Sequence, residues 1–224
     1  MGRVVLPRKY VSPVPEKIAQ RAETEPYSET EQLAFAMWAN TQPTEQSREH
    51  ALVILALGFG AGLNMRDINH LKVRDMHIDD AGVVVSPRDG RFVPVLRQWE
   101  TVLIEAVHGL TPDDYVFRPG RIDSPRNLHN AGSDFLARTK DPKLRPNAYR
   151  LRATWIVTHL QSQVPVDVLL PAAGLKEAHS LAYYMKFVTT PSEQEVRQRL
   201  RGSVTDTGTG RDRPTLRLIE GGGS

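Results

Sequence analysis

The pattern of hydrophobic and polar positions predicts a mainly helical chain. A helix begins at Ser28, whose side chain caps it, and Glu31 lies three residues on as a capping-box partner. A second helix over 45–60 is apolar nearly all round beyond Ala51, which is typical of a buried central helix. The apolar face of the first helix is predicted to hold Leu33, Phe35, Ala36, Met37 and Trp38. Further helices are predicted over 65–71, 98–107, 127–139, 148–161, 165–170, 179–187 and 192–201.

Two β-prone runs interrupt this helical pattern. Residues 82–85 and 91–95 flank Pro87-Arg88-Asp89-Gly90, which is a turn signal between two strands. The predicted fold class is therefore mainly α with a small antiparallel β-hairpin sheet.

The length of 224 residues suits one compact domain with appended ends. Residues 1–26 hold four prolines and are predicted to form a flexible arm, followed by a single domain over 27–201. Residues 202–224 are low in apolar side chains and are predicted to form a disordered tail.

Composition narrows the class of protein. Apolar residues make up 40% and charged residues 25%, as in an ordinary soluble globular protein. The longest apolar run, residues 51–59, is shorter than the roughly 20 residues that span a bilayer. The N-terminus has no sustained apolar core like that of a signal peptide. We therefore expect a cytoplasmic protein without a membrane partner.

The sequence predicts neither a metal site nor a cofactor. It has no cysteine, which excludes disulfides and thiolate metal ligands. The glycine-rich stretch over 58–62 lacks the preceding strand and the Lys-Ser/Thr end of a nucleotide-binding loop. His50 and His179 are interpreted as structural. Four further histidines share no metal-ligand spacing with nearby carboxylates: His70, His77, His129 and His159.

Charge is distributed unevenly although the net charge is only +3. Acidic residues crowd 16–49, whereas arginines and lysines concentrate over 118–152 and again over 197–201. Such separation favours a basic face that attracts polyanions. A solvated surface of mixed charge is the alternative interpretation.

Four short motifs follow one another in the order and spacing of one known family. Residues 61–71 are similar to its Thr-Gly-Leu-Arg-x-x-Glu-Leu-x-x-Leu stretch, and 91–95 to the Arg-x-Val-Pro-Leu that closes its β-hairpin. Residues 149–154 lie where the family has His-x-Leu-Arg-His-Thr. Residues 173–175 followed by Tyr184 are similar to its Leu-Gly-His and the nucleophilic tyrosine. Over about 27–188 the chain therefore resembles the catalytic domain of the tyrosine recombinases, the phage-integrase family.

The resemblance implies a site in which a tyrosine attacks a DNA phosphodiester and forms a covalent phosphotyrosine link. In that family two arginines stabilise the charge on the nonbridging oxygens. A hairpin lysine protonates the leaving 5′ oxygen, and two His or His/Trp positions complete the proton transfers. The second arginine matches Arg152 and the nucleophile matches Tyr184, with Tyr183 as the rival if the register slips by one.

The remaining positions of that site are replaced in this chain. The first arginine falls on the neutral Asn64, and Arg66 lies about 200° further around a helix. The nearest stand-in for the lysine is Arg88, which makes a poor general acid. The two histidine positions fall on Tyr149 and Leu175. Losing one charge-stabilising donor typically costs roughly 10²–10³ in rate, so the resemblance implies a degenerate site.

Each matched residue also has a plain structural interpretation. Arg152 could be a surface arginine, and Tyr184 could pack in the core beside Leu181 and Phe187. Asn64 could close a helix end, a role that asparagine fills well. These alternatives remain open at the level of the sequence.

The sequence thus predicts a catalytically degenerate protein that binds double-stranded DNA in an accessory or regulatory role, associated with the nucleoid. The alternatives are an active recombinase that cleaves DNA through Tyr184, and a helical protein-interaction module without a DNA role. Self-association, or contact with a partner recombinase, is expected through 189–201. The predicted phosphate contacts are Lys143, Arg145, Arg150, Arg152, Arg88, Arg91 and Arg66.

Overall fold

The computed structural model describes residues 25–139 and 145–201. The predicted arm over 1–24, the predicted tail over 202–224 and the predicted phosphate contact at Lys143 lie outside the described residues. The chain divides into two compact units, with the boundary between Val188 and Thr189.

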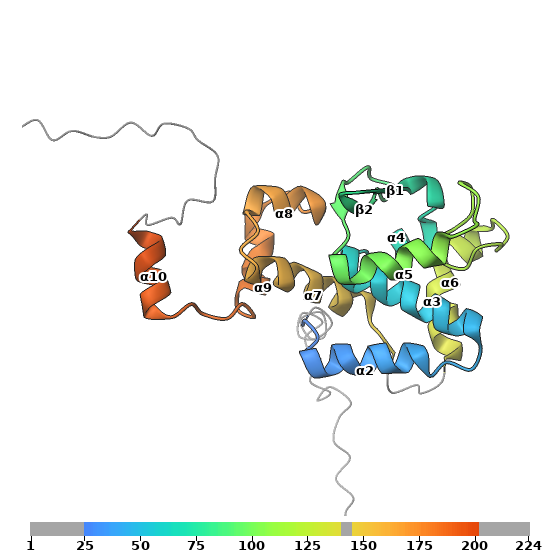
Figure 1. Cartoon of the computed structure of the whole chain (residues 1–224), viewed down its shortest axis with the longest axis horizontal. Helices are drawn as coiled ribbons and strands as arrows, with labels where there is room; N and C mark the ends of the chain where they lie inside the picture. The colour runs from blue at the N-terminus through green and yellow to red at the C-terminus, as the bar shows by residue number, and fades with distance from the viewer. Residues whose placement is uncertain (1–24, 140–144, 202–224) are drawn as a thin grey trace, which may run out of the picture. The chain divides into compact units, whose positions relative to one another are not determined.

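The described part of the first unit is built mainly from helices, as predicted (Figure 1). Its α-helices are α2 (Glu29–Asn40), α3 (Glu45–Leu55), α4 (Met65–His70), α5 (Arg97–Val107), α6 (Pro125–Arg138), α7 (Ala148–Gln161), α8 (Val166–Ala172) and α9 (Ala182–Met185). A π-helix (Ala56–Gly60) continues α3, and short 3₁₀ helices (Val73–Asp75 and Ala178–Leu181) precede β1 and α9. The second unit holds α10 (Glu193–Leu200). Within 25–139 and 145–201, no helix is both long and apolar enough to cross a membrane.

The capping box that the sequence predicts at Ser28 is confirmed, and the predicted helix over 192–201 begins with a second one. Ser28 caps α2, and its backbone N–H donates to Glu31 Oε2 at 2.8 Å. Ser192 caps α10, and its backbone N–H donates to Glu195 Oε2 at 2.8 Å. Each pair satisfies backbone donors that a helix start leaves without partners.

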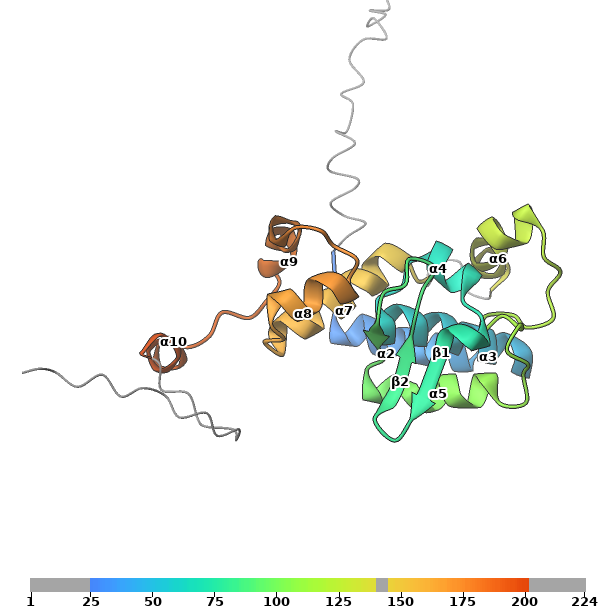
Figure 2. The same cartoon turned by 90° about the horizontal axis from the view of Figure 1, so that it is seen from above.

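The sheet has three antiparallel strands in the order β1-β2-β3 (Figure 2). The predicted hairpin is formed by β2 (Gly82–Val85) and β3 (Val93–Pro94), with Val85 opposite Val93. The strand β1 (Met76–Asp79) was not predicted. Its four residues alternate apolar and polar side chains, but the run is short and mostly exposed, and its pairing with β2 makes it a strand.

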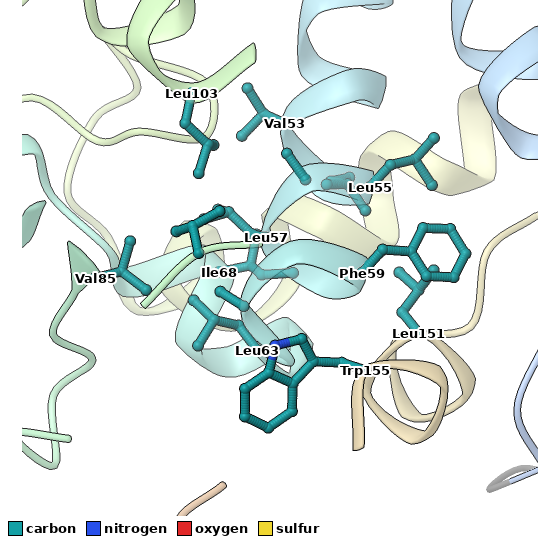
Figure 3. Close-up of a cluster of buried hydrophobic side chains, with 14 of the residues drawn as sticks. Val53, Leu55, Leu57, Phe59, Leu63, Ile68, Val85, Leu103, Leu151 and Trp155 are labelled. Atoms are coloured by element: carbon teal, nitrogen blue, oxygen red, sulfur yellow. The ribbon is translucent and has the colours of Figure 1, made fainter. Parts of the chain in front are cut away.

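The core of the first unit surrounds α3 and the π-helix, which together we call the central segment (Figure 3). Leu55 and Leu57 of this segment are buried together with Leu103 of α5, Val85 of β2 and Leu151 of α7. Burial of each such side chain stabilises the fold by about 1.5–3 kcal/mol. The prediction of a buried central helix over 45–60 is confirmed, with its last turn in π-helical form.

Glycines allow α7 to approach the end of the central segment closely. A Cβ atom at Gly58 would lie 2.5 Å from Leu151 Cδ1. Gly62 has a φ of +60°, and a Cβ there would lie 2.5 Å from Trp155 Cε3. These two glycines of the stretch over 58–62 therefore serve helix packing and the turn into α4.

The predicted apolar face of α2 was wrong at two positions. Phe35, Trp38 and Ala39 are buried, whereas Leu33 and Met37 are exposed. Residues three and four apart lie on one face of a helix, so a face built on Phe35 includes residues 38 and 39. Positions two residues from Phe35 lie about 200° around the helix and point away.

Candidate functional site

Arg152 lies on α7 and anchors two neighbouring segments through its guanidinium. Its Nη1 donates to the carbonyl of Gly62 at 2.8 Å, and its Nη2 donates to the carbonyl of Ala173. The first carbonyl belongs to the turn before α4, and the second to the residue that follows α8. A guanidinium has five N–H donors, so these two bonds leave three for a ligand. Arg152 is half-buried and is thus more than a plain surface arginine.

Arg91 lies just before β3, and its side chain is only 9% exposed. Its Nη2 pairs with Asp67 Oδ2 at 2.6 Å, and its Nε pairs with Asp89 Oδ2 at 2.6 Å. Its Nη1 also donates to the carbonyl of Ala172 at 3.4 Å. A Cβ at Gly174, which has a φ of +60°, would lie 2.8 Å from Arg91 Cδ. A glycine at this position therefore makes room for the arginine.

The end of α8 brings the two arginines together, because they bond to the consecutive carbonyls of Ala172 and Ala173. Burial, and next the charge of Arg91, hold the pKa of Arg152 below its usual value. Tyr184 and Asp67 act in the opposite direction. An arginine nevertheless stays protonated at neutral pH, so both guanidinium groups are charged. We call Arg91, Arg152, Asp67 and Tyr184 the arginine site.

Asn64 begins α4 rather than closing a helix end. Its side-chain oxygen accepts from the backbone N–H of Asp67 at 2.9 Å, which makes it the N-cap. Its Nδ2 donates to Asp67 Oδ2 at 2.9 Å, the same oxygen that Arg91 contacts. Asn64 is thereby joined to the arginine site through one carboxylate oxygen, although it carries no charge.

Tyr184 on α9 is half-buried and packs against the core. Burial raises the pKa of its phenol, whereas the charge of Arg152 lowers it and Tyr183 raises it further. The effect of Arg152 places the Tyr184 phenol within electrostatic range of that guanidinium. The Tyr183 ring instead lies 3.9 Å from Lys186 Nζ and packs edge-on against Tyr184.

The other positions that the resemblance matches form no hydrogen bond or ion pair with this site among the described residues. The Tyr149 residue is 59% exposed on the first turn of α7, and Leu175 packs against the core. Arg88 is exposed in the hairpin turn, and Arg66 is exposed on α4. Among the residues that the structure describes, the arginine site therefore has no histidine or lysine in hydrogen-bonding contact with it.

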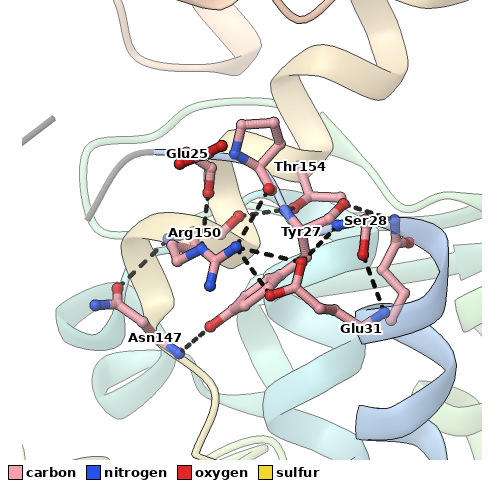
Figure 4. Close-up of polar contacts among 9 residues, drawn as sticks. Glu25, Tyr27, Ser28, Glu31, Asn147, Arg150 and Thr154 are labelled. Carbon is pink, nitrogen blue, oxygen red and sulfur yellow. Dashed lines mark hydrogen bonds and ion pairs between the residues drawn. The ribbon is translucent and has the colours of Figure 1, made fainter. Parts of the chain in front are cut away.

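Arg150 has a structural role that its sequence context did not indicate (Figure 4). Its Nη2 pairs with Glu31 Oε1 at 3.1 Å, and its Nε donates to the carbonyl of Glu25 at 2.9 Å. Its guanidinium lies 3.9 Å from the centre of the Tyr27 ring. These contacts tie α7 to the start of α2, use the Nε and Nη2 donors of Arg150, and offset its charge with Glu31. Arg145 is exposed and donates to the carbonyl of Ala137 at 2.9 Å.

The two carboxylates that pair with Arg91 were not predicted from the sequence. Asp67 stands at the glutamate position of the first motif, and Asp89 stands in the hairpin turn. Both lie next to predicted phosphate contacts, which is the signal that could have identified them. Together they offset the charge of Arg91.

Comparisons with known proteins identify the fold. No protein-family model matches the chain, and no curated protein matches it. The XerA recombinase structure matches with a TM-score of 0.52 and 15% identity, covering 80% of this chain and 63% of that one. The XerH site-specific recombinase bound to its difH substrate matches with a TM-score of 0.53 and 14% identity, covering 81% and 55%. The Tn1549 transposon integrase in complex with circular intermediate DNA matches with a TM-score of 0.54 and 10% identity, covering 81% and 67%.

At these identities the likeness shows the fold alone. The protein has the fold of a tyrosine-recombinase catalytic domain, mainly α with a small antiparallel sheet. The chain spans less than two thirds of the XerA and XerH chains.

Proposed function

We propose that this protein binds double-stranded DNA through the arginine site and does so without cutting a strand. The observation that carries the proposal is the pair of guanidinium groups held side by side at the end of α8. The solved structures of similar fold include the XerH recombinase bound to its difH substrate and the Tn1549 integrase in complex with circular intermediate DNA.

Arg152 is the residue best suited to hold a phosphate. Its two protein partners are neutral carbonyls, so its positive charge is not offset by direct pairing. A planar guanidinium with free N–H groups binds phosphate oxygens in a bidentate manner. The exposed Arg66, Arg88 and Arg145 would add phosphate contacts around it. Arg150 is left out of this set, because Glu31 and backbone carbonyls hold it.

The same site lacks the means to cleave DNA. Burial raises the pKa of Tyr184, so the phenol is a weak nucleophile unless a base removes its proton. At the two histidine positions of the family stand the exposed Tyr149 and the apolar Leu175. Arg88, the nearest stand-in for the family's hairpin lysine, does not release a proton at neutral pH. We therefore assign the protein an accessory or regulatory role at recombination or operator sites, in association with the nucleoid.

A binding experiment tests the DNA role. Fluorescence anisotropy with a short labelled duplex at low salt should show binding that weakens steeply as salt rises. Arg152→Gln should weaken the duplex affinity about tenfold. It should also reduce the slope of log affinity against log salt by about one, which corresponds to one phosphate contact. Arg126→Ala removes the same charge from an exposed position on α6 and is the matched control.

The expected result is a much smaller change for Arg126→Ala than for Arg152→Gln. Equal losses in the two variants would mean that binding depends on net charge and not on the site. The absence of any binding at micromolar protein would favour the helical interaction module without a DNA role. Thermal unfolding of each variant must confirm that it folds.

A second experiment tests the absence of cleavage. A suicide duplex that carries a nick traps a covalent protein–DNA adduct when a tyrosine attacks the phosphodiester. We expect no adduct with the wild-type protein. An adduct that disappears in Tyr184→Phe would show an active recombinase and refute the inactive site.

We further propose that the second unit mediates self-association or contact with a partner recombinase. In α10 the apolar residues Val196 and Leu200 lie four apart and are exposed, next to the intrahelical pair of Arg197 and Glu193 at 3.1 Å. Such a stripe on a charged helix suits docking onto another chain. Analytical ultracentrifugation with and without residues 189–224 tests this, and an unchanged mass would refute it for self-association.

A further inference from the structure

A pocket of about 250 Å³ lies at the start of α3. It is lined by the N-cap Thr44, by Arg118 from the loop before α6, and by Arg138 at the end of α6. None of the described residues that line it is acidic. The central segment runs from residue 45 to 60, so at 1.5 Å per residue its two ends are roughly 24 Å apart. The pocket is therefore separate from Gly62 and the arginine site.

His50 lines this pocket and is only 9% exposed. Its ring packs edge-on between Phe117 and Phe135, with centroid distances of 5.7 and 5.8 Å. Neither ring nitrogen has a hydrogen-bond partner in the part of the chain that the structure describes. Because the ring lines the pocket, a ligand or an ordered solvent molecule in the pocket can bond to its nitrogens.

Arg118 provides the first cation of the pocket. It has a φ of +56°, a left-handed conformation that a side-chain-bearing residue seldom adopts. Within 25–139 and 145–201 its guanidinium makes no ion pair, and its charge acts on His50. An arginine held in this conformation, half-buried and without a carboxylate, has its charge available for an anion.

Two further groups add to the positive potential. Arg138 uses its Nε to bond the carbonyl of Asp134 at 2.9 Å, which leaves its terminal nitrogens available. The helix α3 directs its N-terminus, the positive end of its dipole, at Thr44 and Ser47 in the pocket wall. The hydroxyls of Thr44 and Ser47 bond one another and cap α3, so the groups that remain for a phosphate are the two arginine forks, the helix dipole and the histidine donor.

We propose that this pocket binds one phosphate-type anion, with Arg118 and Arg138 pairing with its oxygens and His50 donating a hydrogen bond. The phosphate belongs either to a small phosphorylated molecule or to a DNA backbone. This pocket shares no residue with the arginine site, so a result that refutes phosphate binding in one of them does not refute it in the other.

The direct test is isothermal titration calorimetry of the full chain with inorganic phosphate, at an ionic strength held constant with chloride. We expect saturable binding of one phosphate. Arg118→Gly removes the cation, and glycine suits the positive φ, so this variant should fold while its phosphate affinity falls about tenfold. His50→Phe keeps the packing against Phe117 and Phe135 but removes the donor, and it should weaken binding by a similar factor.

The control variant is Arg126→Ala, because Arg126 is exposed on α6 as Arg138 is but does not line the pocket. Its phosphate affinity should equal that of the wild type. The proposal is wrong if phosphate does not bind, or if it binds Arg118→Gly and His50→Phe as tightly as the wild type. NMR of the His50 ring gives a second readout, because phosphate should shift its signals in the wild type and in Arg126→Ala alike.

The same variants distinguish the two sources of phosphate. If the DNA backbone supplies it, Arg118→Gly should weaken duplex binding and lower the salt dependence by about one contact. If a small molecule supplies it, Arg118→Gly should lose phosphate affinity while its duplex affinity matches that of Arg126→Ala. Either result supports an anion site, and the choice between them does not depend on Arg152.

Discussion

At the Gly62 end of the central segment an arginine pairs with carboxylates, whereas at the Thr44 end the described arginines of the pocket form no ion pair. Arg91 pairs with Asp67 and Asp89, and Arg152 bonds to two carbonyls. At the other end Arg118 makes no ion pair within the described residues. At the Gly62 end two carboxylates thus offset Arg91 and leave the charge of Arg152 unbalanced, whereas at the Thr44 end no carboxylate of the described residues pairs with Arg118.

The largest expected effect breaks the Gly62 end. In Gly62→Ala the new Cβ would lie 2.5 Å from Trp155 Cε3, and the alanine would have to keep the backbone φ of +60°. Overpacking and the left-handed backbone together should lower the free energy of unfolding by about 4 kcal/mol. Gly90→Ala is the matched control, because Gly90 has a φ of +73° with nothing within 4 Å. Urea unfolding should show a loss of only about 1 kcal/mol there, and equal losses would mean that packing on Trp155 is unimportant.

Local sequence patterns predicted much of this architecture. The capping boxes at Ser28 and Ser192 are read from residues three apart, and the hairpin is read from a four-residue turn. The strand β1 was not predicted because its pairing with β2, and not its composition, makes it a strand. Leu33 and Met37 were misplaced because apolar character was counted without helical periodicity.

The candidate site was predictable only in part, for a similar reason. Motif order singled out Arg152, but the sequence also predicted a phosphate contact at Arg150, two residues earlier on the same helix. The difference comes from Glu31, a partner 119 positions away. His50 was interpreted as structural because Arg118 and Arg138, which complete its pocket, lie on other segments. Long-range pairing decides which arginine is structural and which is available to a ligand.

The most direct comparison of the two ends of the central segment removes one arginine from each. Arg91→Ala leaves Asp67 largely buried without its partner, so the free energy of unfolding should fall by about 3 kcal/mol. Arg118→Gly removes an arginine without an ion pair and relieves a left-handed backbone, so stability should be unchanged or rise by up to about 1 kcal/mol. Urea unfolding midpoints measure both. A large loss in Arg118→Gly would show that Arg118 has a structural role and that the two ends are alike.

Protonation tests the Thr44 end. Burial, and then the charge of Arg118, lower the pKa of His50 from 6.5 to about 4. The unfolded chain binds this proton near pH 6.5 and the folded chain only near pH 4, so the His50 contribution to stability is lost as pH falls through that window. Between pH 7 and pH 5 the wild type should lose about 2 kcal/mol through His50.

His50→Phe is the variant that isolates this contribution. It cannot take up the proton, whereas His159, whose pKa is also lowered by burial, is present in both proteins and cancels. Urea unfolding of the two proteins at pH 7 and pH 5 should therefore show a smaller pH dependence in the variant. Equal pH dependence would mean that the His50 ring reaches solvent and is not confined to a cationic pocket.

The smallest expected effect concerns Asn64, the neutral residue at the position of the first family arginine. Asn64→Ala removes the cap of α4 and should lower the free energy of unfolding by about 1 kcal/mol, whereas Asn64→Ser should retain most of it. Neither variant should change duplex affinity, because both polar side-chain atoms of Asn64 form hydrogen bonds with Asp67.

Asn64→Arg loses the same cap and places a third cation beside Asp67. Stability should again fall by about 1 kcal/mol. Duplex affinity measured by anisotropy should rise, because Asp67 would then be shared between two arginines and the net positive charge of the site would increase. The suicide duplex should still trap no adduct, since Tyr149 and Leu175 provide no proton acceptor near Tyr184. An adduct in this variant would mean that one missing charge, and not the missing proton transfer, keeps the site inactive.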